Sequence, residues 1–390
     1  MKQRMARNAG IGAFLVAALG AAGPDAVPQT EISDAATLPP AGPHQVLVLD
    51  PVYNHAKDGR AYLVDADAAA IQGMIPVAFY GNVVRDPVSG RFYVSETIWT
   101  RGNRGTRQDL LSVYDPKTLQ LTKEIELPGR ALITTKKQDL DISADGKYVY
   151  IYNMAPANAV IVVDTATQKA AANVGLPGCA LAFPFGANGF ALICADGSLA
   201  TVTLDASAKA TVARTAPFFA PDHDPVFEQS PTDRQTGMTY FISYTGLVYP
   251  TKLAARPEIG QPWSISEAAG QTRLTTDPLT VAWRPGGWQV AALHRKSGHL
   301  YVLMHSGPFW THKNDGTEVW EIDVATHKLI RRITLKVPSP LVGVSQDDKP
   351  LLYTTSDDGK FAVYDAETGA YLRGMDKLGD NPVLSAAIGE

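Results

Sequence analysis

Short apolar runs of strand length follow one another along most of the chain. Examples are HQVLVLD, RAYLVD, KYVYIYN, NAVIVVD, HLYVLMH, EVWEID and FAVYD. Their residues alternate between apolar and polar, or form compact β-branched and aromatic runs, which is the pattern of half-buried and buried strands. The sequence shows no long helical periodicity. The pattern therefore predicts an all-β protein.

One unit recurs along the chain: an apolar strand that ends in Asp, a small polar turn and a further strand. The aspartates of these units are Asp65, Asp115, Asp164, Asp205, Asp323 and Asp365, at spacings of 50, 49, 41, 118 and 42. The long interval has room for two further units with an eroded signature, and VYPTKLAAR at 248–256 is one candidate. Since an Asp at a strand end caps the turn with its own side chain, we expect these residues to be structural.

A second signature, a tight turn followed by an aromatic-rich strand, precedes each of these units. It is seen in DPVSGRFYVSE, SADGKYVYIYN, GANGFALICAD, DRQTGMTYFISY, RKSGHLYVLMH and SQDDKPLLYTTS. Two hairpins in each unit of 40 to 50 residues make four strands, which is one blade of a β-propeller. The sequence thus predicts a seven-bladed β-propeller of four-stranded blades over residues 43–390, with HQVLVLD joining the last blade to close the ring. A pair of β-sandwiches explains the period poorly.

Composition supports a turn-rich β protein and argues against one class of partner. The chain of 390 residues has 33 Gly and 27 Pro. Its net charge is −4, only 19% of its residues are charged, and it has no basic run. Nucleic acid is therefore excluded as the expected partner, because nucleic-acid binding needs clustered Lys and Arg.

The N-terminus has the features of a secretory signal peptide, which we place at residues 1–26. Lys2, Arg4 and Arg7 precede an apolar run at 11–22 that is shorter than the roughly 20 residues of a membrane span. The alternative is an uncleaved membrane tether. Residues 27–42 are expected to form a flexible leader, and the mature protein is expected to be exported.

Both cysteines, Cys179 and Cys194, lie in the segment LPGCALAFPFGANGFALICADGS. A structural disulfide, a metal pair and a redox pair are the alternatives. The segment contains no His and no CxxC motif. In an oxidising compartment two cysteines so close in sequence usually bond to each other, which favours an intrachain disulfide between two adjacent strands.

Motifs for catalysis are missing from the sequence. It has no HExxH, no GxSxG and no phosphate-binding glycine loop. The segment DLDISADG at 139–146 resembles a calcium loop but lacks the EF-hand spacing, and PDHDPVF at 221–227 reads as a polar loop. Four histidines suggest a metal site but have no short ligand spacing, so surface or interface roles are favoured for them: His294, His299, His305 and His312. We therefore assign no catalytic residue and no metal ligand.

Three segments place aromatic residues in predicted loops. They are MIPVAFYGN, WRPGGWQ and GPFWTHK, and their aromatic residues are Phe79, Tyr80, Trp283, Trp288, Phe309 and Trp310. Aromatic side chains on loops are frequent anchors of protein interfaces. They also fill gaps between blades, and the sequence leaves both roles open.

From about residue 44 to its C-terminus the chain resembles the heavy chain of quinoprotein amine dehydrogenases, the methylamine and aromatic amine dehydrogenases of the bacterial periplasm. The resemblance is carried by IELPGR, CADGS, HDPVF, ISYTGLVY, WRPGGWQ, LHRKSGHLYVLMH, THK and SQDDKPLLY. It implies a seven-bladed propeller that pairs with a small, disulfide-dense light chain, two heavy with two light. It also implies that the light chain carries the cofactor, tryptophan tryptophylquinone, which is made from two of its own tryptophans. Such enzymes oxidise primary amines to aldehyde and ammonia and pass the electrons to a blue copper protein, amicyanin or azurin.

The resemblance also implies roles for individual residues. Phe79 matches the heavy-chain Phe that lines the substrate channel, and Cys179 and Cys194 match the family's disulfide. Some motifs are similar to the methylamine branch and others to the aromatic amine branch, so the amine stays open. The alternatives are a periplasmic propeller that binds a partner without enzymatic function, and an independent propeller enzyme with a central metal.

Overall fold

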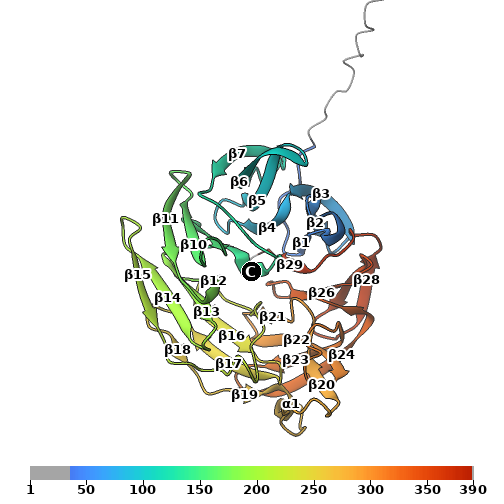
Figure 1. Cartoon of the computed structure of the whole chain (residues 1–390). Helices are drawn as coiled ribbons and strands as arrows, with labels where there is room; N and C mark the ends of the chain where they lie inside the picture. Colours follow the sequence, from blue (N-terminus) through green and yellow to red (C-terminus); the bar gives the residue numbers. More distant parts are fainter. Residues whose placement is uncertain (1–35, 389–390) are drawn as a thin grey trace, which may run out of the picture. The chain divides into compact units, whose positions relative to one another are not determined.

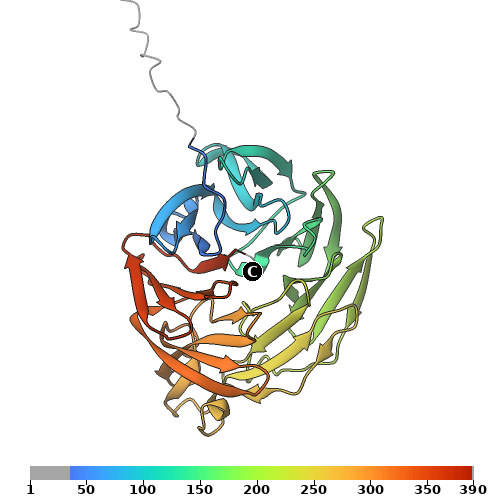
Figure 2. The ribbon, with the colours of Figure 1, turned by 180° about the vertical axis from the view of Figure 1, so that it is seen from behind.

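The computed structural model describes residues 36–388, and the regular structure of this part is almost entirely β. Seven antiparallel sheets are arranged around a common centre (Figures 1 and 2). The predicted seven-bladed β-propeller is thereby confirmed. Three short helical segments lie between strands: η1 (Tyr53–His55), η2 (Lys137–Asp139) and α1 (Ile265–Ala268).

Blades one to four each contain four strands and are given from the centre outward. Blade one consists of β29 (Leu384–Ala387), β1 (Gln45–Asp50), β2 (Gly59–Asp65) and β3 (Ala70–Val77). Blade two consists of β4 (Phe79–Arg85), β5 (Phe92–Arg101), β6 (Arg104–Tyr114) and β7 (Leu121–Glu126). Blade three consists of β8 (Leu140–Ile142), β9 (Tyr148–Asn153), β10 (Ala159–Asp164) and β11 (Lys169–Gly175). Blade four consists of β12 (Cys179–Phe185), β13 (Gly189–Cys194), β14 (Leu199–Leu204) and β15 (Ala210–Arg214).

Blades five to seven complete the ring, and two of them are irregular. Blade five consists of β16 (Met238–Ile242), β17 (Leu247–Lys252), β18 (Glu258–Ile259) and β19 (Trp263–Ser264). Blade six consists of β20 (Ala282–Pro285), β21 (Ala291–His294), β22 (His299–Gly307), β23 (Gly316–Asp323) and β24 (Lys328–Ser339). Blade seven consists of β25 (Val342–Val344), β26 (Leu351–Thr355), β27 (Phe361–Asp365) and β28 (Tyr371–Met375).

Both irregular blades still have four strand positions from the centre outward. In blade five, the isolated pairings Val226↔Ser243 and Thr232↔Thr239 place residues 226–232 inside β16. The short strands β18 and β19 both pair with β17 and share the outermost position. In blade six, β20 and β21 both pair with β22, so the innermost strand is one strand interrupted at residues 286–290.

The long interval between Asp205 and Asp323 contains one blade rather than two. The first five residues of VYPTKLAAR, 248–252, belong to β17, the third strand of blade five, so that candidate unit is confirmed. The remaining length lies in connecting segments, among them the one that carries α1 and leads to β20. Inserted loops therefore account for the spacing that left room for an additional unit.

The repeated aspartates cap turns, as their sequence context predicts. Asp115 shows the pattern: its Oδ1 accepts hydrogen bonds from the backbone N–H groups of Lys117 and Thr118, both at 2.9 Å. These backbone hydrogen bonds lower the pKa of the Asp115 carboxyl group below its ordinary value. Equivalent backbone hydrogen bonds end the third strand of the other five units, at Asp65, Asp164, Asp205, Asp323 and Asp365.

The core lies between blades. One cluster joins Tyr150 and Val160 of blade three to Phe190 and Val202 of blade four, and a second joins blade two to blade three in the same way. Each fully buried Val, Leu or Phe side chain contributes on the order of 1.5–3 kcal/mol. Side chains on both surfaces of each sheet are therefore used to bind the neighbouring blades together.

The ring closes where the two ends of the propeller meet in blade one. β29 from the C-terminal end pairs with β1, and Leu49 lies opposite Leu384. The predicted meeting of the HQVLVLD strand with the C-terminal part of the chain is correct. However, the strand does not join blade seven, because the C-terminal strand crosses to blade one instead.

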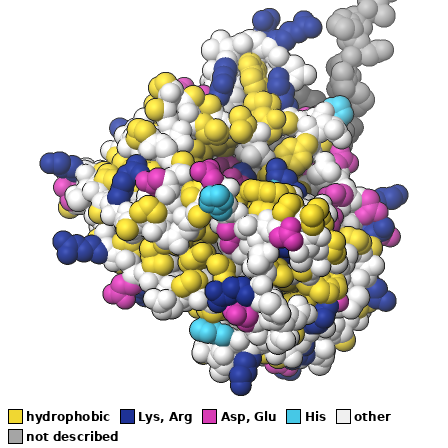
Figure 3. Space-filling view, turned by 60° about the horizontal axis from the view of Figure 1, so that its bottom comes forward, with side chains coloured by type: hydrophobic (Ala, Val, Ile, Leu, Met, Phe, Trp, Pro, Cys, Tyr) yellow, Lys and Arg dark blue, Asp and Glu magenta, His cyan; other side chains and the backbone are white. Residues whose placement is uncertain are grey.

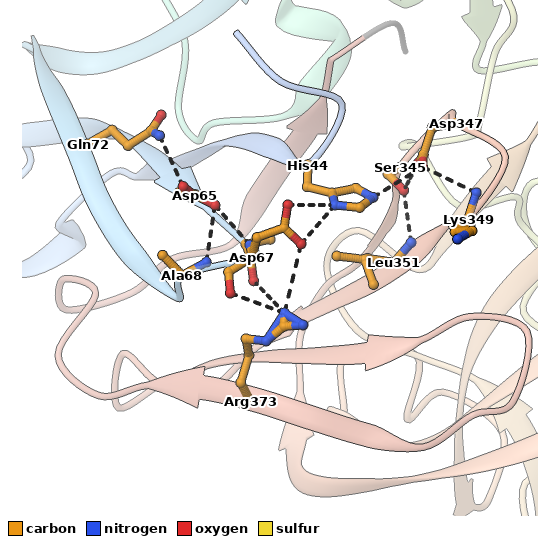
Figure 4. Close-up of polar contacts among 11 residues, drawn as sticks. His44, Asp65, Asp67, Ala68, Gln72, Ser345, Asp347, Lys349, Leu351 and Arg373 are labelled. Carbon is orange, nitrogen blue, oxygen red and sulfur yellow. Dashed lines mark hydrogen bonds and ion pairs between the residues drawn. The ribbon is translucent and has the colours of Figure 1, made fainter. Parts of the chain in front are cut away.

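Side-chain contacts join blades one and seven beside this closure (Figure 4). His44 Nδ1 lies 2.8 Å from an Asp67 carboxylate oxygen, and its Nε2 lies 3.2 Å from Asp347. Arg373 of blade seven donates to the backbone carbonyl of Asp67 at 3.2 Å. The closing blade is thus held by polar side chains as well as by the β29–β1 ladder.

Alternating strand direction gives the propeller two different faces. Four antiparallel strands return the chain to the side where it entered, so every blade begins and ends at the same face. We call this the Phe79 face, since Phe79 begins β4 there. It carries the links between blades and the turns between second and third strands. The opposite hairpin face carries the turns between first and second strands and between third and fourth strands.

The predicted signal peptide, residues 1–26, and most of the predicted leader, 27–42, lie outside the described residues. Within the described end of the leader, the Leu38 N–H donates to the Lys117 carbonyl at 2.8 Å, and the Leu38 side chain packs against an inter-blade cluster. Within residues 36–388 no helix has the length and apolar character needed to cross a membrane.

Candidate functional site

Five of the six aromatic residues chosen from the sequence lie at the same face of the propeller, and the sixth, Trp288, reaches the links at that face from the centre of the ring. Phe79 and Tyr80 open β4, and Trp283 lies near the start of β20. Phe309 and Trp310 belong to the loop between β22 and β23, which connects a second strand to a third. Trp288 donates its indole N–H to the carbonyl of Thr135, in the link between blades two and three, at 3.1 Å. The fold therefore gathers residues from blades two and six at the Phe79 face.

Phe79 forms one wall of an open groove. Its ring centroid lies 4.4 Å from that of Tyr80 and 5.6 Å from that of Trp99. The groove has a volume of about 350 Å³ and is also lined by Lys57 and Asn103. The Lys57 ammonium lies 3.9 Å from the centre of the Trp99 ring, which is the geometry of a cation–π contact. The groove thus has one aromatic wall, Phe79, and a lysine and a carboxylate side by side, Lys57 and Asp58, among its lining residues.

Trp288 lies in the centre of the ring rather than on an exposed loop. It belongs to the interruption at residues 286–290, between the two parts of the innermost strand of blade six. The Gln229 side chain donates to the Trp288 carbonyl at 2.7 Å, and the Lys136 ammonium lies 4.7 Å from the indole centre. Trp288 therefore joins three blades to one another.

Phe309 and Trp283 have packing partners within this chain. Phe309 is only 4% exposed and packs beneath the guanidinium of Arg284, at 5.7 Å. Trp283 packs against Trp320, with ring centroids 6.1 Å apart, and Arg332 covers its face at 4.7 Å. Within this chain both rings fill gaps between side chains, and an interface role for these two residues stays a prediction.

Trp310 has the character of an anchor. It is 53% exposed and stands at the edge of an aromatic cluster. Its ring meets Tyr244 edge-on at 6.0 Å, and Tyr244 stacks on His312 with ring centroids 3.9 Å apart. The cluster supports Trp310 from below and leaves its outer surface open to solvent.

Further apolar side chains are exposed at the same face. Leu279 is 87% exposed and precedes β20, while Ile133 is 73% exposed and lies in the link between blades two and three. Val281 is also exposed. By contrast, charged side chains of both signs are scattered over the view in Figure 3 without one large patch of a single sign. Exposed apolar residues of this size on the same face as an exposed tryptophan are typical of protein interfaces.

The four histidines considered for a metal site do not come together. His294 and His299 flank a turn at the hairpin face, where His299 contacts Glu321 at 2.8 Å. His305 and His312 lie toward the Phe79 face, and His305 contacts the Thr311 hydroxyl at 2.7 Å. Among residues 36–388 there is no group of three or more His, Cys, Asp or Glu residues arranged to hold a metal ion.

Burial keeps the two histidines near the Phe79 face uncharged at neutral pH. Burial, with the nearby Arg284 and His312, lowers the pKa of His305 to about 4. Burial also lowers the pKa of His312, with contributions from Lys313 and Lys136. The aromatic cluster around Trp310 is therefore neutral.

Two titratable groups for which the sequence predicted no shifted pKa, Asp139 and Lys136, lie beneath the Phe79 face. Burial raises the pKa of Asp139 to about 7, although its carboxylate accepts the backbone N–H of Lys136 at 2.7 Å. Burial also lowers the pKa of Lys136 to about 8. In the sequence these two residues are only a Lys and an Asp at the end of a long link between blades. That pattern is too common to predict shifted pKa values. Their proximity comes from the folded link.

The calcium-like segment and the polar loop have structural partners. Asp141 pairs with Arg234 at 2.7 Å, and Asp145 accepts the Ser143 hydroxyl at 2.7 Å within the turn between β8 and β9. Asp224 accepts the Thr245 hydroxyl at 2.6 Å. These carboxylates support turns and a blade contact.

Cys179 and Cys194 form a disulfide, which confirms the predicted intrachain bond. They lie directly opposite each other on β12 and β13 and belong to the cluster between blades three and four. The bond therefore joins the two innermost strands of blade four.

Solved structures share the fold at low sequence identity. A putative 6-phosphogluconolactonase from Bacteroides fragilis matches with a TM-score of 0.57 and 11% identity over 91% of this chain and 98% of that chain. A dihydro-heme d1 dehydrogenase matches with a TM-score of 0.54 and 14% identity over 90% of this chain and 76% of that one. At such identities the likeness concerns the propeller fold alone.

Sequence comparison is more specific. Residues 43–389 match the family model of the methylamine dehydrogenase heavy chain. The methylamine dehydrogenase heavy chain of Methylorubrum extorquens is 31% identical over 88% of this chain and 82% of its own length. That of Methylophilus methylotrophus is 29% identical over 90% of this chain and 84% of its own length. A chain that matches a family over nearly its whole propeller shares its ancestry and its fold, so this protein belongs to the methylamine dehydrogenase heavy chain family.

Proposed function

We propose that this chain is the heavy subunit of a periplasmic amine dehydrogenase that oxidises primary amines to aldehyde and ammonia. The observation that carries the proposal is the family match over residues 43–389, together with the apolar Phe79 face. In this assembly the chain is a scaffold that lines the substrate channel. A small light chain contributes the catalytic residues.

The proposed cofactor, tryptophan tryptophylquinone, belongs to the light chain and supplies the electron-accepting carbonyl chemistry. This chain does not fit the role of its carrier. Most of its six tryptophans pack within the propeller: Trp320, for example, is fully buried, and Trp263 stacks on His327 at 4.9 Å, while Trp310 is exposed at the surface. Among the described residues, Trp283 and Trp320 form the one tryptophan pair in ring contact. Their ring centroids are 6.1 Å apart, and the guanidinium of Arg332 covers the Trp320 ring.

The residues of this chain would act on the substrate by shape and by exclusion of water. Phe79, Tyr80 and Trp99 present an aromatic wall beside the groove. Such a wall removes water from an amine side chain and limits its size, and it leaves the proton transfers to groups on the partner. Lys57 and Asp58 both line the groove, so their opposite charges offset each other and leave the aromatic wall as the feature that selects the amine side chain.

The light chain is proposed to bind at the Phe79 face. Trp310 would be the central anchor, with Ile133 and Leu279 around it, since these exposed apolar side chains lie on the same side as Phe79. Light-chain binding there would cover the groove and complete the channel. We further propose two heavy and two light chains in the assembly, and a blue copper protein, amicyanin or azurin, as the electron acceptor.

Export to the periplasm is proposed from the signal-peptide features of residues 1–26 and is consistent with the disulfide. Cell fractionation of the native host tests it. Recovery of the mature chain, shortened near residue 26, in the periplasmic fraction is expected. Full-length chain in the cytosol would contradict export.

The function is tested by purifying the tagged, exported protein from its native host and recording an absorption spectrum. A co-purifying small subunit and a quinone band that bleaches when a primary amine is added are expected. A propeller that purifies alone and colourless would contradict the proposal and favour a non-enzymatic binding module. Repeating the measurement with methylamine, butylamine and benzylamine identifies the preferred side chain.

A further inference from the structure

The backbone that presents Phe79 and Tyr80 has an unusual conformation. Tyr80 has a φ of 44°, in the left-handed region that favours glycine. The Gly81 N–H donates to the Ala78 carbonyl at 2.9 Å, which closes a tight turn at the start of β4. A Cβ atom on Gly81 would lie 2.4 Å from the Val77 side chain, so the turn also depends on glycine there. Such a turn needs support from its surroundings.

Arg130 supplies that support from beneath the turn. It follows β7 in the link between blades two and three and is only 3% exposed. Its Nη1 donates to the Phe79 carbonyl at 3.2 Å, and its Nη2 donates to the Tyr80 carbonyl. One guanidinium thus holds two consecutive carbonyl groups, a bidentate arrangement that suits its planar fork.

Buried carboxylates balance this cation and hold neighbouring atoms. Glu96 accepts the backbone N–H of Ala78 at 2.9 Å, and Asp109 accepts the backbone N–H of Arg130 itself at 3.1 Å. Burial lowers the pKa of Arg130 to about 10, and the nearby Asp139 and Asp109 oppose the shift, so the guanidinium stays charged at neutral pH. The turn therefore rests on a charged and hydrogen-bonded base.

We propose that Arg130 is a positioning residue that holds the Phe79–Tyr80 wall in place and thereby sets which amines enter the channel. The assignment of a channel rests on the proposed function. The placement of the two aromatic residues by Arg130 does not, because it follows from the contacts within this chain. In this view the wall is rigid, and amine selectivity depends on a residue that never touches the amine.

The first test uses the full-length heavy chain without its partner. Hydrogen exchange by mass spectrometry compares the wild type with Arg130→Met and Arg130→Lys over residues 76–84. We expect exchange there to speed up on the order of tenfold in Arg130→Met, because local opening becomes easier, and less in Arg130→Lys. Arg107→Met is the matched control, since Arg107 contacts Asp109 and the Arg130 carbonyl but neither Phe79 nor Tyr80. Unchanged exchange in Arg130→Met, or equal acceleration in Arg107→Met, would overturn the placement.

The second test uses the complex with the light chain and measures kcat and KM for methylamine and benzylamine. We expect Arg130→Met to change the ratio of the two kcat/KM values on the order of tenfold, with Arg130→Lys closer to the wild type. Combined with Phe79→Ala, Arg130→Met should add no further change. A uniform fall in kcat for both amines would overturn the selectivity role. Wild-type protein that oxidises no amine would instead contradict the proposed function, while the exchange result still decides the placement.

Discussion

Phe79 shows how one side chain acquires a role through its position. On the sequence it is one aromatic residue in MIPVAFYGN, and its channel role rested on resemblance. The structure puts its ring in an open groove beside Tyr80 and Trp99. Its role in substrate choice is still a prediction.

Replacing Phe79 by Ala should change amine preference or KM and leave subunit assembly intact, because the ring lines the groove without carrying a core contact. Loss of a phenyl wall of this kind changes discrimination on the order of 10–200-fold. Steady-state kinetics of the purified complex with a series of amines measures it. Tyr371→Ala, an exposed aromatic on the outer strand of blade seven, is the control. Identical kinetics in Phe79→Ala and wild type would show that the channel lies elsewhere.

His305 predicts how stability responds to acid. Its folded-state pKa of about 4 lies below the ordinary histidine value of 6.5, so between these pH values the unfolded chain binds more protons than the folded chain. The contribution of His305 to stability is therefore complete above about pH 6.5 and is lost as the pH falls toward 4. In His305→Gln the decrease in the free energy of unfolding over this range should be smaller. Urea unfolding at pH 7, 5.5 and 4.5 measures it, and parallel curves for the two proteins would refute the assignment.

At the scale of elements, the Asp-capped turn is the local device that repeats from blade to blade. Four residues after the Asp, the chain enters the left-handed region, at Ala69, Leu119, Gln168, His327 and Gly369. Blade seven is the one of these five that uses glycine. The turn is thus specified twice, by the capping carboxylate and by a residue that tolerates positive φ.

Exchanging the residue at this position should have opposite effects in two blades. Gly369→Ala should lower the free energy of unfolding by about 1–2 kcal/mol, because an Ala at a φ of 77° is strained and its Cβ would lie 3.0 Å from Ile333. Gln168→Gly, at a φ of 55°, should leave the free energy unchanged or raise it slightly. Urea denaturation compares the two variants with the wild type. Equal destabilisation by both would mean that side-chain contacts, rather than backbone strain, govern the turn.

For the whole molecule, the position of a residue on one face or the other follows from strand order. The Phe79 face carries Trp310, Leu279 and Ile133, while the exposed Val88 lies in the turn between β4 and β5 on the hairpin face. The two faces therefore supply a matched pair of exposed apolar positions for testing where the partner binds.

Trp310→Glu combined with Leu279→Asp should reduce co-purification of the light chain by about tenfold or more, because charges would replace apolar anchors in a desolvated interface. Val88→Asp should leave co-purification unchanged. The amount of small subunit recovered with each tagged heavy chain measures the effect. If Val88→Asp released the light chain and the double variant did not, the docking face would be the opposite one.

Much of the fold was predictable because it is encoded locally. Asp-ended strands, Gly-containing hairpins and their 41- to 50-residue spacing predicted four-stranded blades, whereas the 118-residue interval left room for one unit more than the structure has. Blade five was hard to predict, since its third strand lacks the Asp and its innermost segment, 226–232, pairs through isolated bridges. The destination of β29 was not predictable either, because strands from opposite ends of the chain meet only after the ring has formed.

The sequence alone determined the blade pattern, the turn aspartates, the disulfide pairing and the family, since each depends on residues close together in the chain or on motifs spread along it. Only the tertiary structure decided which side chains share the Phe79 face, and that Phe309 is buried while Trp310 is exposed. It also brought the Arg130 guanidinium to the carbonyl of Phe79, 51 positions away. Such contacts join a strand of one blade to the segment that connects it to the next blade. They depend on how the ring closes and on which buried charges need a partner. A local sequence pattern contains no information on either.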